Sequence, residues 1–150
     1  MPDIVDQKTR SRMMSGIRTR DTTPEVTLRK ALFARGFRYR VCVRGIAGRP
    51  DIVLRYLNAV IFVHGCFWHG HDCPLFRLPS TRREFWAHKI ESNRQRDRTV
   101  LAELLSQGWR TCTVWECAIR GKNRVTINAV ATRVAAWLRG DARELSIRGS

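Results

Sequence analysis

Lysine and the acidic residues are scarce in this sequence of 150 residues. Only four of its 28 cationic side chains are lysines, and the 13 acidic residues leave a formal net charge of +15. An excess of this size repels itself unless a polyanion is bound. The arginine guanidinium pairs bidentately with phosphate and with guanine edges, whereas the lysine ammonium acts as a point charge. The composition therefore favours nucleic acid as the partner over a merely solvated basic surface.

Long apolar segments are also missing. Runs such as Ala59 to Val63 fall far short of the roughly 18 residues that a membrane-spanning helix needs. The start of the chain, with Asp3 and Asp6 and no apolar stretch, does not resemble a secretory signal. We therefore expect a cytoplasmic protein with no membrane association. In that compartment the five cysteines serve as metal ligands or core residues rather than as disulfides.

The length suits one domain, and the periodicity of apolar residues predicts an α/β fold. Residues 1–22 are expected to form a flexible arm that contacts DNA, residues 23–140 a single domain, and residues 141–150 a polar tail. Inside the domain the pattern predicts a helix, three strands, a helix, a strand and a helix. Their ranges are 24–35, 37–42, 51–56, 59–63, a long helix from a Thr81–Glu84 capping box to Gly108, 109–115 and 125–139.

This order of elements is that of a restriction-endonuclease-like core, a mixed central sheet flanked by helices. Its three consecutive short strands predict an antiparallel meander. In that fold the catalytic groups lie on the second and third strands. The pattern alone indicates a fold and not the chemistry, which has to be argued from particular side chains.

The densest chemical signal lies in residues 64–73, which hold three of the four histidines and two of the five cysteines. The spacings of standard zinc fingers, CxxC and HxxxH, are missing, so a zinc site here is of an uncommon type. Cys66, His71 and Cys73 can converge from this window. The best fourth donor is Cys117, because it lies just beyond a predicted strand.

Two other residues are alternatives for one of these ligands, namely Cys112 and His69. Cys42 and Cys112 fall within predicted strands and are interpreted as small buried core residues. A closed site of four soft ligands would fasten an otherwise irregular loop to the edge of the sheet. The sequence therefore predicts a structural zinc site.

Asp51 follows a proline at the head of the second predicted strand, and His64 lies just past the end of the third. A hairpin would bring the Asp51 carboxylate and groups at the neighbouring strand end around one divalent cation. His64 and His69, if free of zinc, can orient or deprotonate water. Glu25 can add a second carboxylate through water, although glutamate in a first helical turn also complements the helix dipole.

Three aromatic side chains, Phe67, Trp68 and Trp86, fall in or just after the polar loop. Aromatic wedges can enter a base stack, and unstacking costs least at a mismatched pair. Core packing is the alternative interpretation, and it is strongest for Trp86.

Five segments resemble the very short patch repair (Vsr) mismatch endonucleases. They are TRDTTPE (19–25), GRPD (48–51), VIFVHGCFWHGHDC (60–73), TRREFW (81–86) and VWECAIRG (114–121), in order within residues 8–138. The resemblance implies a Mg²⁺-dependent enzyme that nicks one DNA strand 5′ of the thymine in a T:G mismatch. That mismatch is left when 5-methylcytosine deaminates, and the nick starts very short patch repair. It also implies a monomer whose partners are mismatched DNA and DNA repair proteins.

The resemblance further implies that Asp51 and the main-chain carbonyl of Val63 hold Mg²⁺. Glu25, His64 and His69 would act on this ion through water, with His69 as the base for the attacking water.

Zinc would be held by Cys66, His71, Cys73 and Cys117. The wedge would consist of Phe67, Trp68 and Trp86 in the major groove and Met14, from the arm, in the other groove.

The sequence departs from the family pattern at three points. Val63 stands where members often carry threonine, and Gly70 and Asp72 interrupt the histidine run. Relative to the wider PD-(D/E)XK nucleases, Phe62 and His64 stand where an acid and a lysine would be. A double-strand-cutting restriction-type nuclease or a His-metal-finger nuclease remains an alternative, as does a non-catalytic zinc module that binds damaged DNA.

Overall fold

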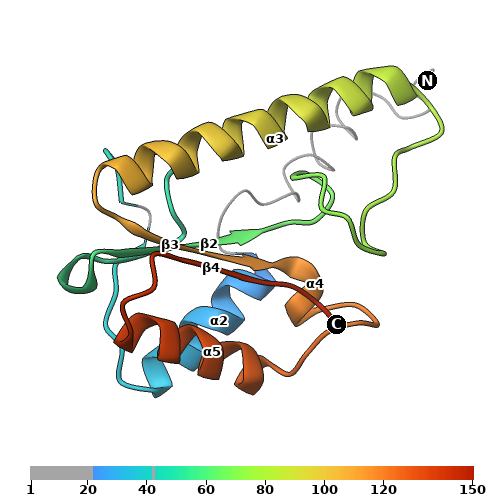
Figure 1. Cartoon of the computed structure of the whole chain (residues 1–150). Helices are drawn as coiled ribbons and strands as arrows, with labels where there is room; N and C mark the ends of the chain where they lie inside the picture. The colour runs from blue at the N-terminus through green and yellow to red at the C-terminus, as the bar shows by residue number, and fades with distance from the viewer. Residues whose placement is uncertain (1–21, 42) are drawn as a thin grey trace, which may run out of the picture.

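The computed structural model describes residues 22–41 and 43–150. The predictions for Met14, for Cys42 and for the arm up to residue 21 lie outside the described residues. A four-stranded sheet forms the centre of the described part, with helices on both of its faces (Figure 1). Its strands are β1 (Ile52–Leu54), β2 (Ala59–His64), β3 (Arg110–Trp115) and β4 (Glu144–Ile147).

The strands lie side by side in the order β1-β2-β3-β4. β1 is antiparallel to β2, whereas β2 and β3, and β3 and β4, are parallel. The sheet is therefore mixed, which confirms the predicted α/β sheet flanked by helices. One face is covered by α3 (Arg83–Ser106), and the other by α2 (Thr23–Ala34), α5 (Ile127–Arg139) and the short α4 (Glu116–Ile119).

β2 shows why the sheet needs covering on both faces. Side chains alternate along a strand, so Ile61 joins the core under α2 and α5 while Val60 and Phe62 join the core under α3. All three are at most 5% exposed. A strand buried on both faces is continuously apolar, and this run carries β2 to His64 at its carboxyl end.

Helix α2 begins in a capping box one residue earlier than the sequence predicts. The Thr22 hydroxyl accepts the Glu25 N–H, and the Glu25 carboxylate accepts the Thr22 N–H, at 3.4 and 3.2 Å. The box fixes Glu25 at the start of the helix, where it is only 3% exposed. Glu25, a residue of the candidate site, is thus also part of the capping box of this helix.

The predicted strand at 37–42 is wrong over its described residues, 37–41. Only Arg40 pairs with the sheet, through two hydrogen bonds of 2.9 Å exchanged with Val53. A longer strand would have no partner, because β1 is only three residues long. After Leu54 the chain turns into a 3-10 helix, η1 (Arg55–Leu57). The predicted strand at 51–56 is shortened in the same way, and the meander is reduced to one hairpin.

Two further predictions are corrected. Residues 141–150 are not simply a polar tail, because they contain β4, whose Ile147 is fully buried. The Thr81–Glu84 capping box is wrong, since the chain enters α3 through Arg82 in a left-handed conformation (φ +55°) with no side-chain cap. Within the described residues no helix combines the length and the apolar character needed to cross a membrane.

Candidate active site and metal centre

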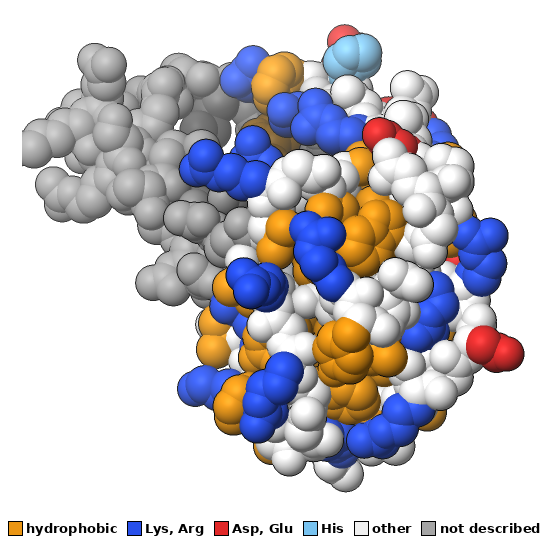
Figure 2. Space-filling model, turned by 90° about the vertical axis from the view of Figure 1, so that its left-hand side faces the viewer, with side chains coloured by type: hydrophobic (Ala, Val, Ile, Leu, Met, Phe, Trp, Pro, Cys, Tyr) orange, Lys and Arg blue, Asp and Glu red, His pale blue; other side chains and the backbone are white. Residues whose placement is uncertain are grey.

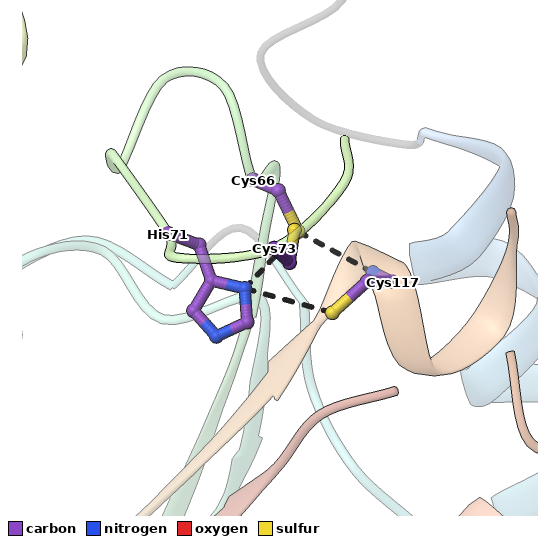
Figure 3. A group of neighbouring side chains, drawn as sticks. All are labelled: Cys66, His71, Cys73 and Cys117. Atoms are coloured by element: carbon purple, nitrogen blue, oxygen red, sulfur yellow. Dashed lines mark hydrogen bonds between the residues drawn. The ribbon is translucent and has the colours of Figure 1, made fainter. Parts of the chain in front are cut away.

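The loop between β2 and α3 folds back so that Cys66, His71 and Cys73 lie beside Cys117 of α4 (Figure 3). Their four ligand atoms all lie within 4.8 Å of one another. Cys66 and Cys117 are at most 3% exposed. The structure therefore brings together the four residues predicted as zinc ligands, while the alternatives Cys112 and His69 are not part of this group.

The spacing of these donors fits a tetrahedral ion. The sulfur atoms of Cys66 and Cys117 lie 3.6 and 3.5 Å from His71 Nδ1. In a zinc tetrahedron with Zn–S and Zn–N bonds of about 2.3 and 2.0 Å, sulfur and nitrogen would be about 3.5 Å apart. Burial raises the pKa of the Cys66 thiol, so a cation is what would favour the thiolate form. The donor set therefore suits zinc.

A second cluster lies on the α3 face of the sheet, where β2 ends. His69 Nδ1 is 2.6 Å from the Asp97 carboxylate of α3. The rings of His64 and His69 stack with centroids 3.7 Å apart and planes 4° apart. His64 Nδ1 is buried without a hydrogen-bond partner. Burial, and secondarily the charge of His69, lowers the pKa of His64 to about 3, so His64 is neutral at pH 7.

This second cluster is better suited to moving protons than to holding a metal. Ligand atoms of His64, His69 and Asp97 do lie within 4.8 Å of one another. However, imidazole donates in the plane of its ring, and two parallel stacked rings cannot both aim a lone pair at one ion. Asp97 instead fixes the orientation of His69, as carboxylates do for catalytic histidines.

Sequence analysis missed Asp97, which lies among arginines in the long helix. The only available signal was its four-residue spacing from Asn93, which places both on one helix face. Asn93 donates to the Trp68 carbonyl at 2.9 Å, and Arg94 donates to the Gly70 carbonyl at 3.0 Å. One face of α3 therefore holds the loop that carries His69 and Trp68.

The carboxylates lie on the opposite face of β2, toward α2. Asp51 accepts the Val63 N–H at 2.6 Å. Burial raises the pKa of Asp51, and a hydrogen bond with Glu25 raises it further. Glu25 is also paired with Arg29 at 3.1 Å. The structure therefore brings Asp51, Glu25 and the main chain of Val63 together, and the magnesium site expected at these residues stays a prediction.

Aromatic side chains form a platform beside the histidines. The ring centroids of Phe67, Trp68 and Trp86 lie 5.1 to 5.9 Å from one another. Trp68 is 37% exposed, and Phe85, which sequence analysis did not select, stacks edge-on against Trp86 and is 47% exposed. An exposed aromatic platform on a folded domain indicates a binding surface.

A groove of about 820 Å³ is lined by His64 and His69 and by Phe67 and Trp68 of the platform. It runs from the start of α2 past the end of β2 to α3 and α4. Its lining residues are Thr22, Thr23, Pro24, Val63, His64, Gly65, Phe67, Trp68, His69, Lys89, Asn93, Glu116 and Arg120. Histidines, aromatic rings and cations thus face one open space.

Comparison with known proteins identifies the family. The profile of the family described as DNA mismatch endonuclease Vsr matches residues 2–75. The chain is 44% identical over 147 residues to the DNA mismatch endonuclease Vsr of Escherichia coli (strain K12), covering 98% of this chain and 94% of that protein. This chain belongs to the Vsr family of DNA mismatch endonucleases.

Two nicking enzymes are also similar to this chain. The type II nicking enzyme V.XorIIP of Xanthomonas oryzae pv. oryzae is 41% identical over 119 residues, covering 79% of this chain and 88% of that enzyme. The type II nicking enzyme V.NmeAIP of Neisseria meningitidis serogroup A is 43% identical over 122 residues, covering 81% and 87%.

Proposed function

We propose that this protein nicks one strand of duplex DNA on the 5′ side of the thymine in a T:G mismatch, and so starts very short patch repair of deaminated 5-methylcytosine. Family membership supports the reaction class. The observation that carries the proposal is that the exposed Trp68 and the Asp97-bound His69 line or adjoin one groove. A mismatch opened by the aromatic platform would lie beside the group that accepts a proton.

The charge distribution supports DNA as the substrate. Figure 2 shows Lys and Arg side chains spread over one face of the described molecule, with few acidic side chains among them. Lys89 and Arg120 add cations to the groove itself. Duplex DNA attracts such a surface through its phosphates, and sequence recognition then requires contacts with the bases. The mixed four-stranded sheet, with helices on both faces, supports a restriction-endonuclease-like core for the fold.

Two metals are part of the proposal. Asp51 and the Val63 carbonyl would hold Mg²⁺, supported by Glu25, and Cys66, His71, Cys73 and Cys117 would hold Zn²⁺. Magnesium would supply positive charge to the phosphate as negative charge develops on it. Zinc would be structural, because all four of its positions are filled by protein donors.

The residues of the chain divide the remaining work. Asp97 occupies Nδ1 of His69, which leaves Nε2 to accept a proton from the attacking water. The water oxygen bonds to phosphorus as the phosphodiester P–O bond breaks. His64, neutral and stacked on His69, keeps the ring from rotating. Phe67, Trp68 and Trp86 would wedge beside the mismatch, with Met14 entering from the other groove.

The test uses labelled duplexes that carry T:G, T:A or C:G at one position in several flanking sequences, with Mg²⁺ or with EDTA. We expect a single nick 5′ of the thymine, only in T:G duplexes, only in some contexts and only with Mg²⁺. Linearisation of a supercoiled matched plasmid would instead indicate a restriction-type or His-metal-finger nuclease. Binding of mismatched DNA without cleavage under every condition would indicate a non-catalytic module.

A further inference from the structure

The segment formed by residues 144–150 runs along the Cys/His cluster. β4 pairs with β3 in parallel, with Val114 opposite Ile147, so the chain leaves β4 at the same end of the sheet at which β3 leads to Cys117. Ile147 is fully buried and anchors the segment in the core. Residues 148–150 follow β4, so they are distant in the sequence from the loop that carries three of the four ligands, and they reach those ligands in the fold.

Each part of the chain that carries a ligand receives a contact from this segment. The Arg148 guanidinium donates to the carbonyl of Asp72, which lies between two ligands. The Gly149 N–H donates to Cys117 Sγ, with a nitrogen-to-sulfur distance of 3.3 Å. An N–H donor directed at sulfur favours the charged thiolate that a metal ion needs.

The third contact is with Trp115, whose ring packs on a ligand. Ser146 Oγ accepts the Trp115 indole N–H at 3.3 Å. The Trp115 ring stacks on His71 with centroids 4.0 Å apart and planes 10° apart, and its edge meets His64 at 5.3 Å. The segment therefore supports the orientation of the histidine ligand, and the same tryptophan connects the metal centre with the catalytic histidines.

Gly149 is suited to this close approach. A Cβ at this position would lie 2.6 Å from the Cys117 carbonyl oxygen and 2.8 Å from that of Asn123. Both neighbours are backbone atoms, which cannot move as a flexible side chain can. The next residue, Ser150, donates its N–H to the same Asn123 oxygen at 2.9 Å. The contact with Cys117 thus depends on the absence of a side chain.

We propose that residues 146–149 form a second layer around the Cys/His cluster and determine how tightly it holds its metal. Arg148 and Gly149 act as positioning residues for the loop ligands and for the Cys117 sulfur. The proposal rests on occupancy of the cluster by zinc and not on the nicking reaction. Outer partners of metal ligands commonly change metal affinity by about 10- to 100-fold.

The test measures metal transfer from the zinc-loaded full chain to a chromogenic chelator. We expect Gly149→Ala and Arg148→Ala to release zinc at least tenfold faster than the unsubstituted chain, and Arg148→Lys, which keeps a donor, to restore part of the difference. The matched control is Glu144→Ala, an exposed position at the start of β4. Cobalt-loaded protein gives a second measurement, because a weakened sulfur contact changes the intensity of its sulfur-to-cobalt absorption.

Release rates within twofold of the control, with unchanged cobalt spectra, would overturn the proposal. Circular dichroism of each zinc-loaded variant identifies any that does not fold, and Arg148→Ala then decides the matter because it removes an exposed side chain. A protein that releases no zinc because it contains none would also overturn it. Neither result bears on T:G nicking, whose failure would in turn leave the release measurements intact.

Discussion

The two faces of β2 differ at its carboxyl end in a way that divides the candidate site. Toward α2 lie the acids, Asp51 and Glu25, and toward α3 lies the pair of His64 and His69. Burial disfavours the charged form on both faces, so it raises the pKa of Asp51 and lowers that of His64. Asp51 therefore needs a cation before it is fully ionised, whereas His64 is neutral without one.

The largest expected effect comes from removing the charge on the acidic face. Asp51→Asn keeps an oxygen that can accept the Val63 N–H, so the hairpin should remain folded. Nicking of a T:G duplex with Mg²⁺ should fall by about a thousandfold or more, because the ligand charge that holds the cation is lost. Binding of the same duplex, measured by fluorescence anisotropy, should change little. Undiminished nicking would remove Asp51 from the proposed reaction.

A smaller loss is expected on the histidine face. Asp97→Asn should lower kcat by about a hundredfold and leave KM for the mismatched duplex nearly unchanged, because Asp97 acts on the orientation of His69. Glu103→Gln, an exposed position on the same helix, is the control.

The combination of Asp97→Asn with His69→Ala sharpens this expectation. If the carboxylate works only through the imidazole, the double variant should be no slower than His69→Ala alone. Additive losses would show that Asp97 has a separate role.

The parts of the site that are close together in the sequence could be predicted from it. Residues close together in the chain, such as Cys66, His71 and Cys73, are visible as a cluster in the sequence. The continuous apolar run of β2 likewise predicts a strand. Roles assigned to these residues remain predictions, although the structure places them side by side.

Long-range pairings could not be predicted in this way. Asp97 is 28 residues from His69, and the contact depends on how α3 packs on the loop. β4 is four residues long, too short for alternation to stand out among polar neighbours, and it is stabilised by pairing with β3. The 37–41 segment failed for the opposite reason, because its alternation is real but its partner strand ends too soon.

Substitution of an aromatic side chain should affect mismatch recognition less than the substitutions above affect nicking. Trp68→Ala should reduce the preference for T:G over C:G duplexes by about tenfold, since stacking of an aromatic side chain on a base contributes about 1 to 3 kcal/mol. General DNA binding, measured on matched duplex, should stay the same. Tyr56→Ala, an exposed aromatic residue in η1 at the other end of the β1–β2 hairpin, is the control. An unchanged T:G to C:G ratio would mean that the platform does not enter the base stack.

The smallest effect concerns stability, and it tests whether His64 is neutral in the folded chain. In the unfolded chain His64 has its ordinary pKa of about 6.5, whereas in the folded chain burial lowers this pKa to about 3. Between these values the unfolded state holds more protons, so the free energy of unfolding should fall on acidification by at most about 1.4 kcal/mol per pH unit. Urea unfolding at pH 7, 6 and 5 without Mg²⁺ measures this slope. His64→Gln should reduce the slope, and the exposed His88→Gln should not. Equal slopes in both variants would mean that His64 is already charged in the fold, and the contrast between the two faces of β2 would be lost.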